Sequence, residues 1–217
     1  MLGSDVSNHT SVVSGQWPVA SKPNLARLEP LITDHCRDNV GSRGGKNSKH
    51  TMSLSPAEFR KAMGCFATGV TIITLDLEGE VHGMTANAFA SVSLDPPLLL
   101  VCVDHSARTH AHLRSKKRFG INILAEHQRV ISEYYARLVH SPERAEEESG
   151  ARFDRTVHGT PILHGALAYL ECRLQSAQAA GDHTIFIAEV EDVVVRQGDP
   201  LLFFRGKYRR MGQEVAG

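Results

Sequence analysis

The chain has 217 residues, of which 41% are hydrophobic, and its 24 lysines and arginines balance its 24 aspartates and glutamates. This length and composition are typical of a single domain with one substantial core. The balanced charge argues against a nucleic-acid-binding or membrane-surface protein, and no apolar run approaches the roughly 18 residues of a membrane-spanning helix.

Four cysteines, Cys36, Cys65, Cys102 and Cys172, are widely spaced and form no CxxC pair. Two of them lie in apolar runs, where a thiol behaves as a small buried hydrophobe. The amino terminus lacks the basic segment followed by an apolar one that a secretory signal requires. We therefore expect a cytoplasmic protein with structural thiols.

Residues 1–51 are rich in Ser, Gly, Pro and Asn and show little periodicity. Such a segment buries too little apolar area to offset its ordering entropy. We predict a disordered amino-terminal extension there, followed by one domain at residues 52–213. A dispensable leader and a regulatory tail are both open interpretations of the extension.

Ser55-Pro56-Ala57-Glu58 predicts a helix start, with Ser55 as cap and Glu58 completing a capping box. Residues 70–75 (VTIITL) are β-branched and predict a strand. A hairpin turn at residues 76–79 leads into the next strand. After it, the unbroken apolar run 98–103 (LLLVCV) predicts a buried strand.

Residues 83–97 (GMTANAFASVSLDPP) carry only two bulky side chains in the middle, Phe89 and Val92, among small neighbours. Small residues leave room for a flat ligand close to the backbone, whose N–H groups and hydroxyls can donate to its edge. The structural alternative is a small-residue strand that packs against a neighbouring strand.

The rest of the chain alternates between strands and a few helices. We predict a helix from Ser106 to about Lys116, and a second at 125–138 with Val130, Ile131, Tyr134, Tyr135 and Leu138 toward the core. We predict a surface loop at 141–150, and strands at 119–124, 166–175, 183–195 and 201–204. Short strands with tight turns favour a closed or partly closed antiparallel barrel. No GxGxxG follows a strand, which argues against a Rossmann domain.

Six phrases resemble, in order and spacing, the flavin reductase family, the short-chain NAD(P)H:flavin oxidoreductases of two-component flavin monooxygenases. They are CFATGVTIIT (65–74), GMTANAFASVSLDPPLLLVCV (83–103), FGINIL (119–124), LAYLEC (167–172), GDHTIFIAEV (181–190) and PLLFFRGKY (200–208). The resemblance implies a mainly β fold, the FMN-binding split β-barrel of Greek-key topology with a few peripheral helices, paired as a homodimer.

The implied activity is hydride transfer from NADH or NADPH to FMN or FAD, with the reduced flavin supplied to a separate oxygenase. Two alternatives remain: a non-catalytic flavin-binding or electron-carrier protein, and a related split-barrel oxidase acting on a small molecule. The preferred nicotinamide is open, because a 2′-phosphate would need a basic contact. Candidates for that contact are Arg205, Lys207, Arg209 and Arg210.

Hydride transfer needs stacked rings and donors to the flavin edge rather than an acid or base. The absence of a Ser/His/Asp triad is therefore expected. The resemblance implies that the flavin ring lies against Thr85, Ala86, Asn87 and Ala88. Ser91 or Ser93 would reach the ribityl or phosphate oxygens; strand alternation favours only one of them, and we rank Ser93 first.

A second cradle for the flavin is expected at Val103, Asp104, Ser106, Arg108 and Thr109, where a strand end leads into a helix start. Free N–H groups and a positive dipole suit a phosphate there, and Arg108 would add a charge-assisted bond. Without the family resemblance, Ser106 is an ordinary helix cap and Arg108 a solvated charge.

Three further residues complete the expected site. The family resemblance places His183 of GDHTIF near the open face of the flavin, where it would orient the nicotinamide, although a lone histidine beside a turn is usually a surface residue. Asn122 would bond either the backbone or the flavin. Tyr208 would close the pocket, or simply be an aromatic at the barrel edge.

His105, His110 and His112 raise the question of a metal site. His110 and His112 are two residues apart on a predicted helix and so lie on different faces. Carboxylate or cysteine ligands at useful spacing are missing from the neighbouring sequence. We therefore predict no metal.

Overall fold

A computed structural model describes residues 54–137 and 142–213, which all belong to the compact unit Met52–Gly217. The predictions for residues 1–51 lie outside the described residues. The helices are short: α1 (Pro56–Met63), α2 (Arg108–Lys116), α3 (Arg129–Tyr135) and α4 (Ala145–Ser149), with 3-10 turns η2 (Glu126–Gln128) and η3 (Pro142–Arg144). The predicted capping box is confirmed, since Ser55 Oγ accepts from Glu58 N and Ser55 N donates to the Glu58 carboxylate.

Strands make up far more of the described chain than helices, and every strand pair in it is antiparallel. The strands are β1 (Thr68–Gly69), β2 (Thr71–Leu77), β3 (Glu80–Ala86), β4 (Phe89–Leu94), β5 (Pro97–Asp104), β6 (Arg118–Ile123), β7 (Phe153–Arg155), β8 (Pro161–Leu163), β9 (Ala168–Ala180), β10 (His183–Val195), β11 (Leu202–Phe204) and β12 (Lys207–Arg209). The main sheet has seven strands in the order β3-β2-β6-β9-β10-β5-β4.

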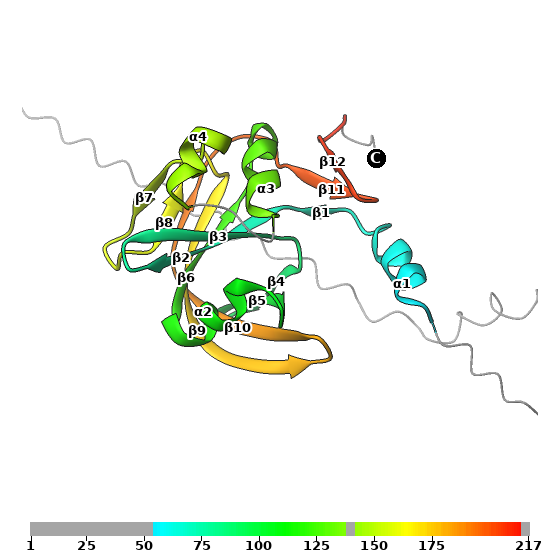
Figure 1. Cartoon of the computed structure of the whole chain (residues 1–217), viewed down its shortest axis with the longest axis horizontal. Coiled ribbons are helices and arrows are strands. Elements are labelled where there is room, and N and C mark those ends of the chain that lie inside the picture. The colour runs from blue at the N-terminus through cyan, green and yellow to red at the C-terminus, as the bar shows by residue number, and fades with distance from the viewer. Residues whose placement is uncertain (1–53, 138–141, 214–217) are drawn as a thin grey trace, which may run out of the picture. The chain divides into compact units, whose positions relative to one another are not determined.

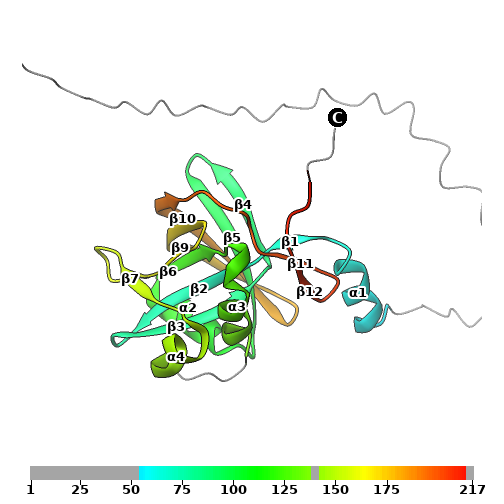
Figure 2. The same ribbon diagram turned by 90° about the horizontal axis from the view of Figure 1, so that it is seen from above.

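The two outer strands of this sheet, β3 and β4, are consecutive in the chain and joined by only Asn87 and Ala88. A connection this short spans no more than about 11 Å, so the sheet must curl until its two edges meet (Figures 1 and 2). On one side Ala86 pairs with Thr71 of β2, and on the other the Ala88 carbonyl accepts from Cys102 N of β5 at 3.0 Å. We call residues 85–88 the seam. This curled sheet confirms the predicted mainly β, split-barrel fold.

Both faces of β2 are buried, which explains its continuous β-branched sequence. Because successive side chains of a strand point to opposite faces, Ile73 packs in the barrel interior with Val101 and Phe186, whereas Ile72 belongs to a second core. That second core lies beneath α3 and α4 and includes Tyr134. Figure 1 shows these helices over β2 and β3, with α2 on the other side of the sheet.

Two expectations for residues 125–150 are wrong. The expected helix at 125–138 is a 3-10 turn followed by α3, which ends at Tyr135, and Val130 is 54% exposed rather than turned to the core. Ile131, Tyr134 and Tyr135 are buried as predicted, while Leu138 lies outside the described residues. The stretch 142–149 is not a loop, because it forms η3 and α4. Glutamates have good helix propensity, and Ala145 packs into the second core.

No helix among residues 54–137 and 142–213 is both long and apolar enough to cross a lipid bilayer.

Candidate functional site

The carboxyl end of β5 brings together three segments that are far apart in the sequence. Ala88 of the seam bonds Cys102 of this strand, and Asp104, two residues further along, pairs with His183 of β10. The chain then turns into α2. The seam, the α2 start and the GDH turn therefore lie around one strand end.

Asn87 lies between two hollows at the seam. The larger, about 340 Å³, is lined by Phe66, Ala67, Thr68, Gly69, Thr71, Asn87, Phe89 and Ile123. The smaller, about 150 Å³, is lined by Val70, Thr85, Ala86, Asn87, Ala136, Phe203 and Tyr208. Their combined size is at the lower end of the roughly 300–1,000 Å³ typical of ligand pockets. Asn87 and Ala88 are both exposed, which leaves room for the edge of a flat ring.

Two polar side chains of the seam form hydrogen bonds to α3 and β1, one short and one long. The Thr85 hydroxyl donates to the Ser132 carbonyl at 2.7 Å, and the Ser132 hydroxyl lies 2.9 Å from the Tyr208 hydroxyl. The Asn87 amide donates weakly to Thr68 Oγ1 at 3.3 Å and is exposed. Thr85 and Tyr208 thus shape the smaller hollow, whereas the Asn87 amide is free to turn toward a ligand.

The ranking of Ser93 over Ser91 loses its basis in the structure. The register of β4 against β5 shifts between these two serines. Such a bulge breaks the strict alternation of side chains. Ser91 is exposed and Ser93 is half-buried.

Three members of the expected phosphate cradle have other partners. Ser106 is not a helix cap, because α2 begins at Arg108 after Ala107; its N–H and hydroxyl both donate to Asp104 Oδ1 at 2.7 Å. Thr109 is 2% exposed, and its hydroxyl lies 2.8 Å from His82 Nε2, so that hydroxyl does not face solvent. The Val103 side chain is buried in the barrel core. Arg108 is exposed at the first turn of α2 and remains available to an anion.

Asn122 cannot serve as a flavin contact. Its side chain is fully buried and all of its polar atoms are used: Nδ2 donates to the Ile72 carbonyl and to Thr74 Oγ1, and Oδ1 accepts from Leu163 N at 2.8 Å. Of the two roles considered for it, the structure supports the backbone contact.

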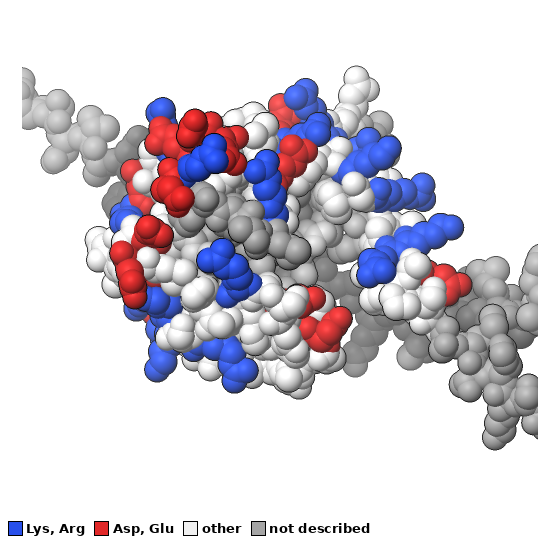
Figure 3. Space-filling model, in the orientation of Figure 1, with Lys and Arg blue, Asp and Glu red and all other residues white. Residues whose placement is uncertain are grey.

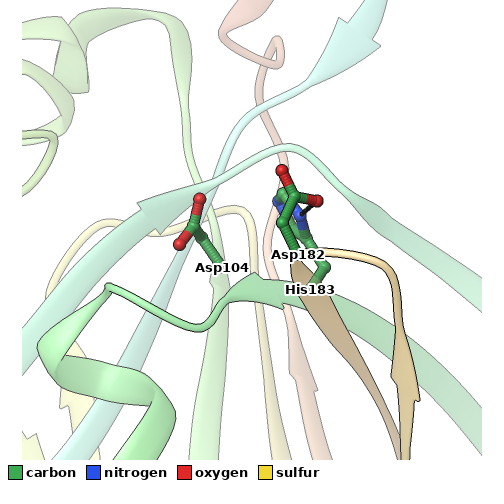
Figure 4. A group of neighbouring side chains, drawn as sticks. All are labelled: Asp104, Asp182 and His183. Carbon is green, nitrogen blue, oxygen red and sulfur yellow. Dashed lines mark hydrogen bonds and ion pairs between the residues drawn. The ribbon is translucent and has the colours of Figure 1, made fainter.

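His183 lies beside two carboxylates, Asp104 and Asp182 (Figure 4). Its Nδ1 is 2.7 Å from Asp182 Oδ1, and ligand-type atoms of the three residues lie within 4.8 Å of one another. The hydrogen bond from His183 holds the pKa of Asp182 below its usual range, and the hydrogen bonds from Ser106 do the same for the pKa of Asp104. Both carboxylates are therefore ionised at neutral pH.

The other histidines of this region form two pairs. His105 and His110 both approach Thr184 Oγ1, at 3.1 and 2.8 Å, with ring centroids 5.0 Å apart. His112 lies against His82 instead, at a centroid distance of 5.2 Å. Burial lowers the pKa of His110, assisted by the nearby charge of His105.

Sequence reasoning missed the contribution of β1 and of Asp182. Thr68 and Gly69 line the larger hollow, although neither was among the predicted site residues. The signal was present, because CFATGV is one of the phrases that carry the resemblance. Asp182 is the middle residue of GDH, but its bond to His183 could not be inferred from adjacency alone.

Charged side chains are unevenly distributed on the face seen in Figure 3. Figure 3 shows acidic side chains gathered over α4, and lysines and arginines on the side that carries α1, β11 and β12. Four exposed cations lie on or beside the last two strands: Arg205, Lys207, Arg209 and Arg210. Arg209 and Arg210 line a further hollow of about 450 Å³ together with Arg129 and Tyr208.

Comparison with known proteins identifies the family. Residues 63–212 match the family model described as flavin reductase like domain. The chain is 42% identical over 161 residues to an NADH-dependent flavin reductase of Rhodococcus sp, covering 73% of this chain and 88% of the relative. It is 38% identical over 155 residues to the reductase component of a 4-nitrophenol 4-monooxygenase/4-nitrocatechol 2-monooxygenase of Rhodococcus opacus, covering 71% and 80%.

A solved structure agrees with these sequence relatives. The flavin reductase PheA2 in its native state superposes with a TM-score of 0.67 at 43% identity, covering 74% of this chain and all of that one. The matched region contains the seam, α2 and the GDH turn, which are the segments gathered at the end of β5. The chain belongs to the flavin reductase-like family.

Proposed function

We propose that this protein is an NADH-dependent flavin reductase that reduces FMN or FAD in its 52–213 domain. When bound, the flavin accepts a hydride from the reduced nicotinamide. The convergence of the seam, the α2 start and His183 at one end of β5 carries the proposal. A named relative supports it, since it is an NADH-dependent flavin reductase that is 42% identical to this chain.

The seam would hold the ring. The backbone of Ala86 and Ala88 and the Asn87 amide would meet its polar edge. Donors aimed at that edge stabilise negative charge that develops on reduction. Thr85 and Tyr208 would support this contact indirectly, because both bond Ser132 of α3.

The start of α2 would hold the phosphate of the flavin. The first N–H groups of a helix have no partner within it and carry the positive end of the helix dipole. Arg108 adds a full positive charge at this point, and Ser91 or Ser93 would contact the ribityl chain. Ser106 would contribute indirectly, by holding the Asp104 turn that precedes the helix.

His183 would orient the nicotinamide on the open side of the ring. Productive transfer requires the donor carbon about 3–3.5 Å from its acceptor, so a residue that fixes the nicotinamide rotation raises the rate without exchanging a proton. We expect His183→Ala to raise the KM for NADH about tenfold, or 1.4 kcal/mol, with little change in the KM for flavin.

The decisive experiment is steady-state oxidation of NADH and NADPH with FMN, FAD and riboflavin as acceptors. We expect turnover with NADH and at least one phosphorylated flavin, with preference over NADPH. Lack of turnover with every combination would refute the reductase assignment and favour a non-catalytic flavin carrier. Flavin retained through dialysis would indicate a bound prosthetic group rather than a diffusible substrate.

A separate oxygenase is the expected recipient of the reduced flavin. One relative is named as the reductase component of a monooxygenase, and the flavin site described above is built at a surface seam. The expected test is product formation by an oxygenase that lacks a reductase of its own, when supplied with this protein, NADH and flavin. We also infer a cytoplasmic location, in keeping with free thiols at Cys65, Cys102 and Cys172.

We further propose a homodimer. α1 has no buried residue within the described part of the chain, and its apolar side chains Phe59 and Met63 are 55% and 53% exposed. Exposed apolar faces of this kind mark interaction surfaces. Light scattering should give twice the chain mass, and Phe59→Glu should shift the protein toward monomer, whereas Glu133→Gln on α3 should not.

A further inference from the structure

We propose that Asp182 is a positioning residue: it holds the His183 ring with its proton on Nδ1, so that Nε2 offers a lone pair to the carboxamide N–H of the reduced nicotinamide. This inference rests on the proposed function, because it assumes that His183 meets the nicotinamide. It concerns the polarity of that contact, which neither the fold nor the family membership specifies.

Both residues are held in place by their backbones. His183 is paired on one side with Asp104 of β5 and on the other with Ala180 of β9. The Asp182 carbonyl accepts from His105 N at 3.0 Å, which ties the tip of the β9–β10 hairpin to the turn before α2. The Asp182–His183 bond is therefore formed between side chains whose backbones are both anchored.

The charge state of Asp182 determines which ring nitrogen carries the proton. The hydrogen bond from His183 lowers the pKa of the Asp182 carboxyl, and an ionised carboxylate can only accept hydrogen bonds. The partner atom 2.7 Å away, His183 Nδ1, must then be the donor. In the neutral ring the other nitrogen, Nε2, is left as an acceptor.

Nε2 is available for a ligand. Within residues 54–137 and 142–213, the ring of His183 hydrogen-bonds only through Nδ1, and its side chain is 42% exposed. The amide nitrogen of a nicotinamide carboxamide carries two N–H donors, which match this acceptor. The carboxylate of the deamidated analogue, nicotinic acid adenine dinucleotide, has no N–H and would leave Nε2 facing another acceptor.

The first test turns His183 Nε2 from a hydrogen-bond acceptor into a donor. In Asp182→Asn the new amide N–H can donate to Nδ1, which moves the ring proton to Nε2 and turns that atom into a donor. With FMN saturating at pH 8.5, we compare kcat/KM for reduced nicotinamide adenine dinucleotide and for reduced nicotinic acid adenine dinucleotide. The wild type should favour the carboxamide by at least about tenfold, and Asp182→Asn should lose most of that ratio through a higher KM for NADH.

Two matched variants separate polarity from charge and from general disturbance. Asp104→Asn removes a carboxylate of the same cluster, while its retained oxygen can still accept from Ser106; it should keep the wild-type ratio within about threefold. Asp154→Asn breaks another exposed Asp–His pair, Asp154 Oδ2 to His164 Nε2 at 2.7 Å. It should leave kcat/KM unchanged for both reduced dinucleotides. If Asp104→Asn relaxes the ratio as much as Asp182→Asn, the effect is one of charge and the proposal is overturned.

The second test does not depend on turnover, because it reads the protonated nitrogen of the wild-type ring. Long-range ¹H–¹⁵N spectra of the imidazole rings, with the His183 signal assigned by its loss in His183→Gln, report the tautomer directly in the wild type. A proton on Nδ1 is expected; a proton on Nε2 would overturn the proposal. If the wild type oxidised no NADH with any flavin, the proposed function and the nicotinamide role would fail together, while this spectrum would still decide whether Asp182 sets the tautomer.

Discussion

The Thr160 hydroxyl donates a 2.6 Å hydrogen bond to Oε1 of Glu171, whose side chain is only 2% exposed. Thr156 Oγ1 donates to the same oxygen at 2.9 Å, and His158 Nδ1 lies 3.3 Å from the other one. A carboxylate near the start of β9 therefore holds the turn between β7 and β8 against the barrel. An ionised group this deeply buried is stable only when it is well hydrogen-bonded.

Replacement of Glu171 should change how stability depends on pH. Burial alone would raise the pKa of Glu171, but the bonds from Thr160, His158 and Thr156 outweigh it and hold the pKa below the ordinary 4.5. A depressed carboxyl pKa gives stability that is present above 4.5 and lost as pH falls through the folded value. We expect Glu171→Gln to cost about 1–3 kcal/mol at pH 7, with a smaller deficit at pH 4.

Urea unfolding at both pH values measures this difference. Glu133→Gln is the matched control, because it removes an exposed helical ion pair with Arg129 of a kind worth about 0.3–0.5 kcal/mol. A deficit for Glu171→Gln that did not shrink at low pH would contradict the argument.

Gly120 should not tolerate a side chain. A Cβ at this position would lie 2.5 Å from Thr74 Oγ1 and 2.8 Å from the Tyr169 ring. The Thr74 hydroxyl already donates to the Pro161 carbonyl and accepts from Asn122, so it cannot move away without breaking a buried network. We expect Gly120→Ala to lower the free energy of unfolding by about 1–3 kcal/mol, and Gly212→Ala, which meets no atom within 4 Å, to leave it unchanged.

Asn87→Ala should weaken the binding of riboflavin, FMN and FAD to the same extent. Its amide is proposed to meet the ring, which riboflavin, FMN and FAD share, so loss of one hydrogen bond should raise each Kd about tenfold. Because Asn87 is exposed, thermal stability should hardly change. Fluorescence titration with the three flavins measures the effect, and a loss confined to FMN and FAD would contradict the assignment to the ring.

Arg108→Ala should weaken the binding of FMN but not that of riboflavin. Its guanidinium at the start of α2 is proposed to meet a phosphate, which riboflavin lacks, so the Kd for FMN should rise about tenfold while that for riboflavin stays constant. The control is Arg114→Ala at the other end of the same helix. Equal losses for FMN and riboflavin would remove the anion site from α2.

Much of the fold could be predicted because its signals are local. The run at 70–75 is β-branched and buried on both faces, and the Ser55 capping box is written in four residues. The seam could not be predicted, because the meeting of β3 and β4 depends on how far the whole sheet curls. Val130 shows another limit, since it fits an apolar helix pattern yet lies 54% exposed on a helix shorter than expected.

For the candidate site, the motifs indicated segments that the structure gathers at the end of β5, but not which way each polar side chain turns. Asn122 and Thr109 look like ligand contacts in the sequence, yet both are buried and bonded to the protein, Asn122 to Ile72 and Thr109 to His82. A strand or helix start fixes the position of a residue along the chain, whereas the packing of neighbouring elements decides whether its hydroxyl or amide meets solvent.

The junction of the outer strands at Asn87 and Ala88 has a consequence for the residence time of a bound flavin. A flavin ring bound at this junction, as proposed, would be held at its edge, and no strand would have to unfold for it to leave. The residence time of the flavin should then be short and determined by a few hydrogen bonds at the ring edge. A short residence time would suit a protein that releases reduced flavin to a second protein rather than one that retains it.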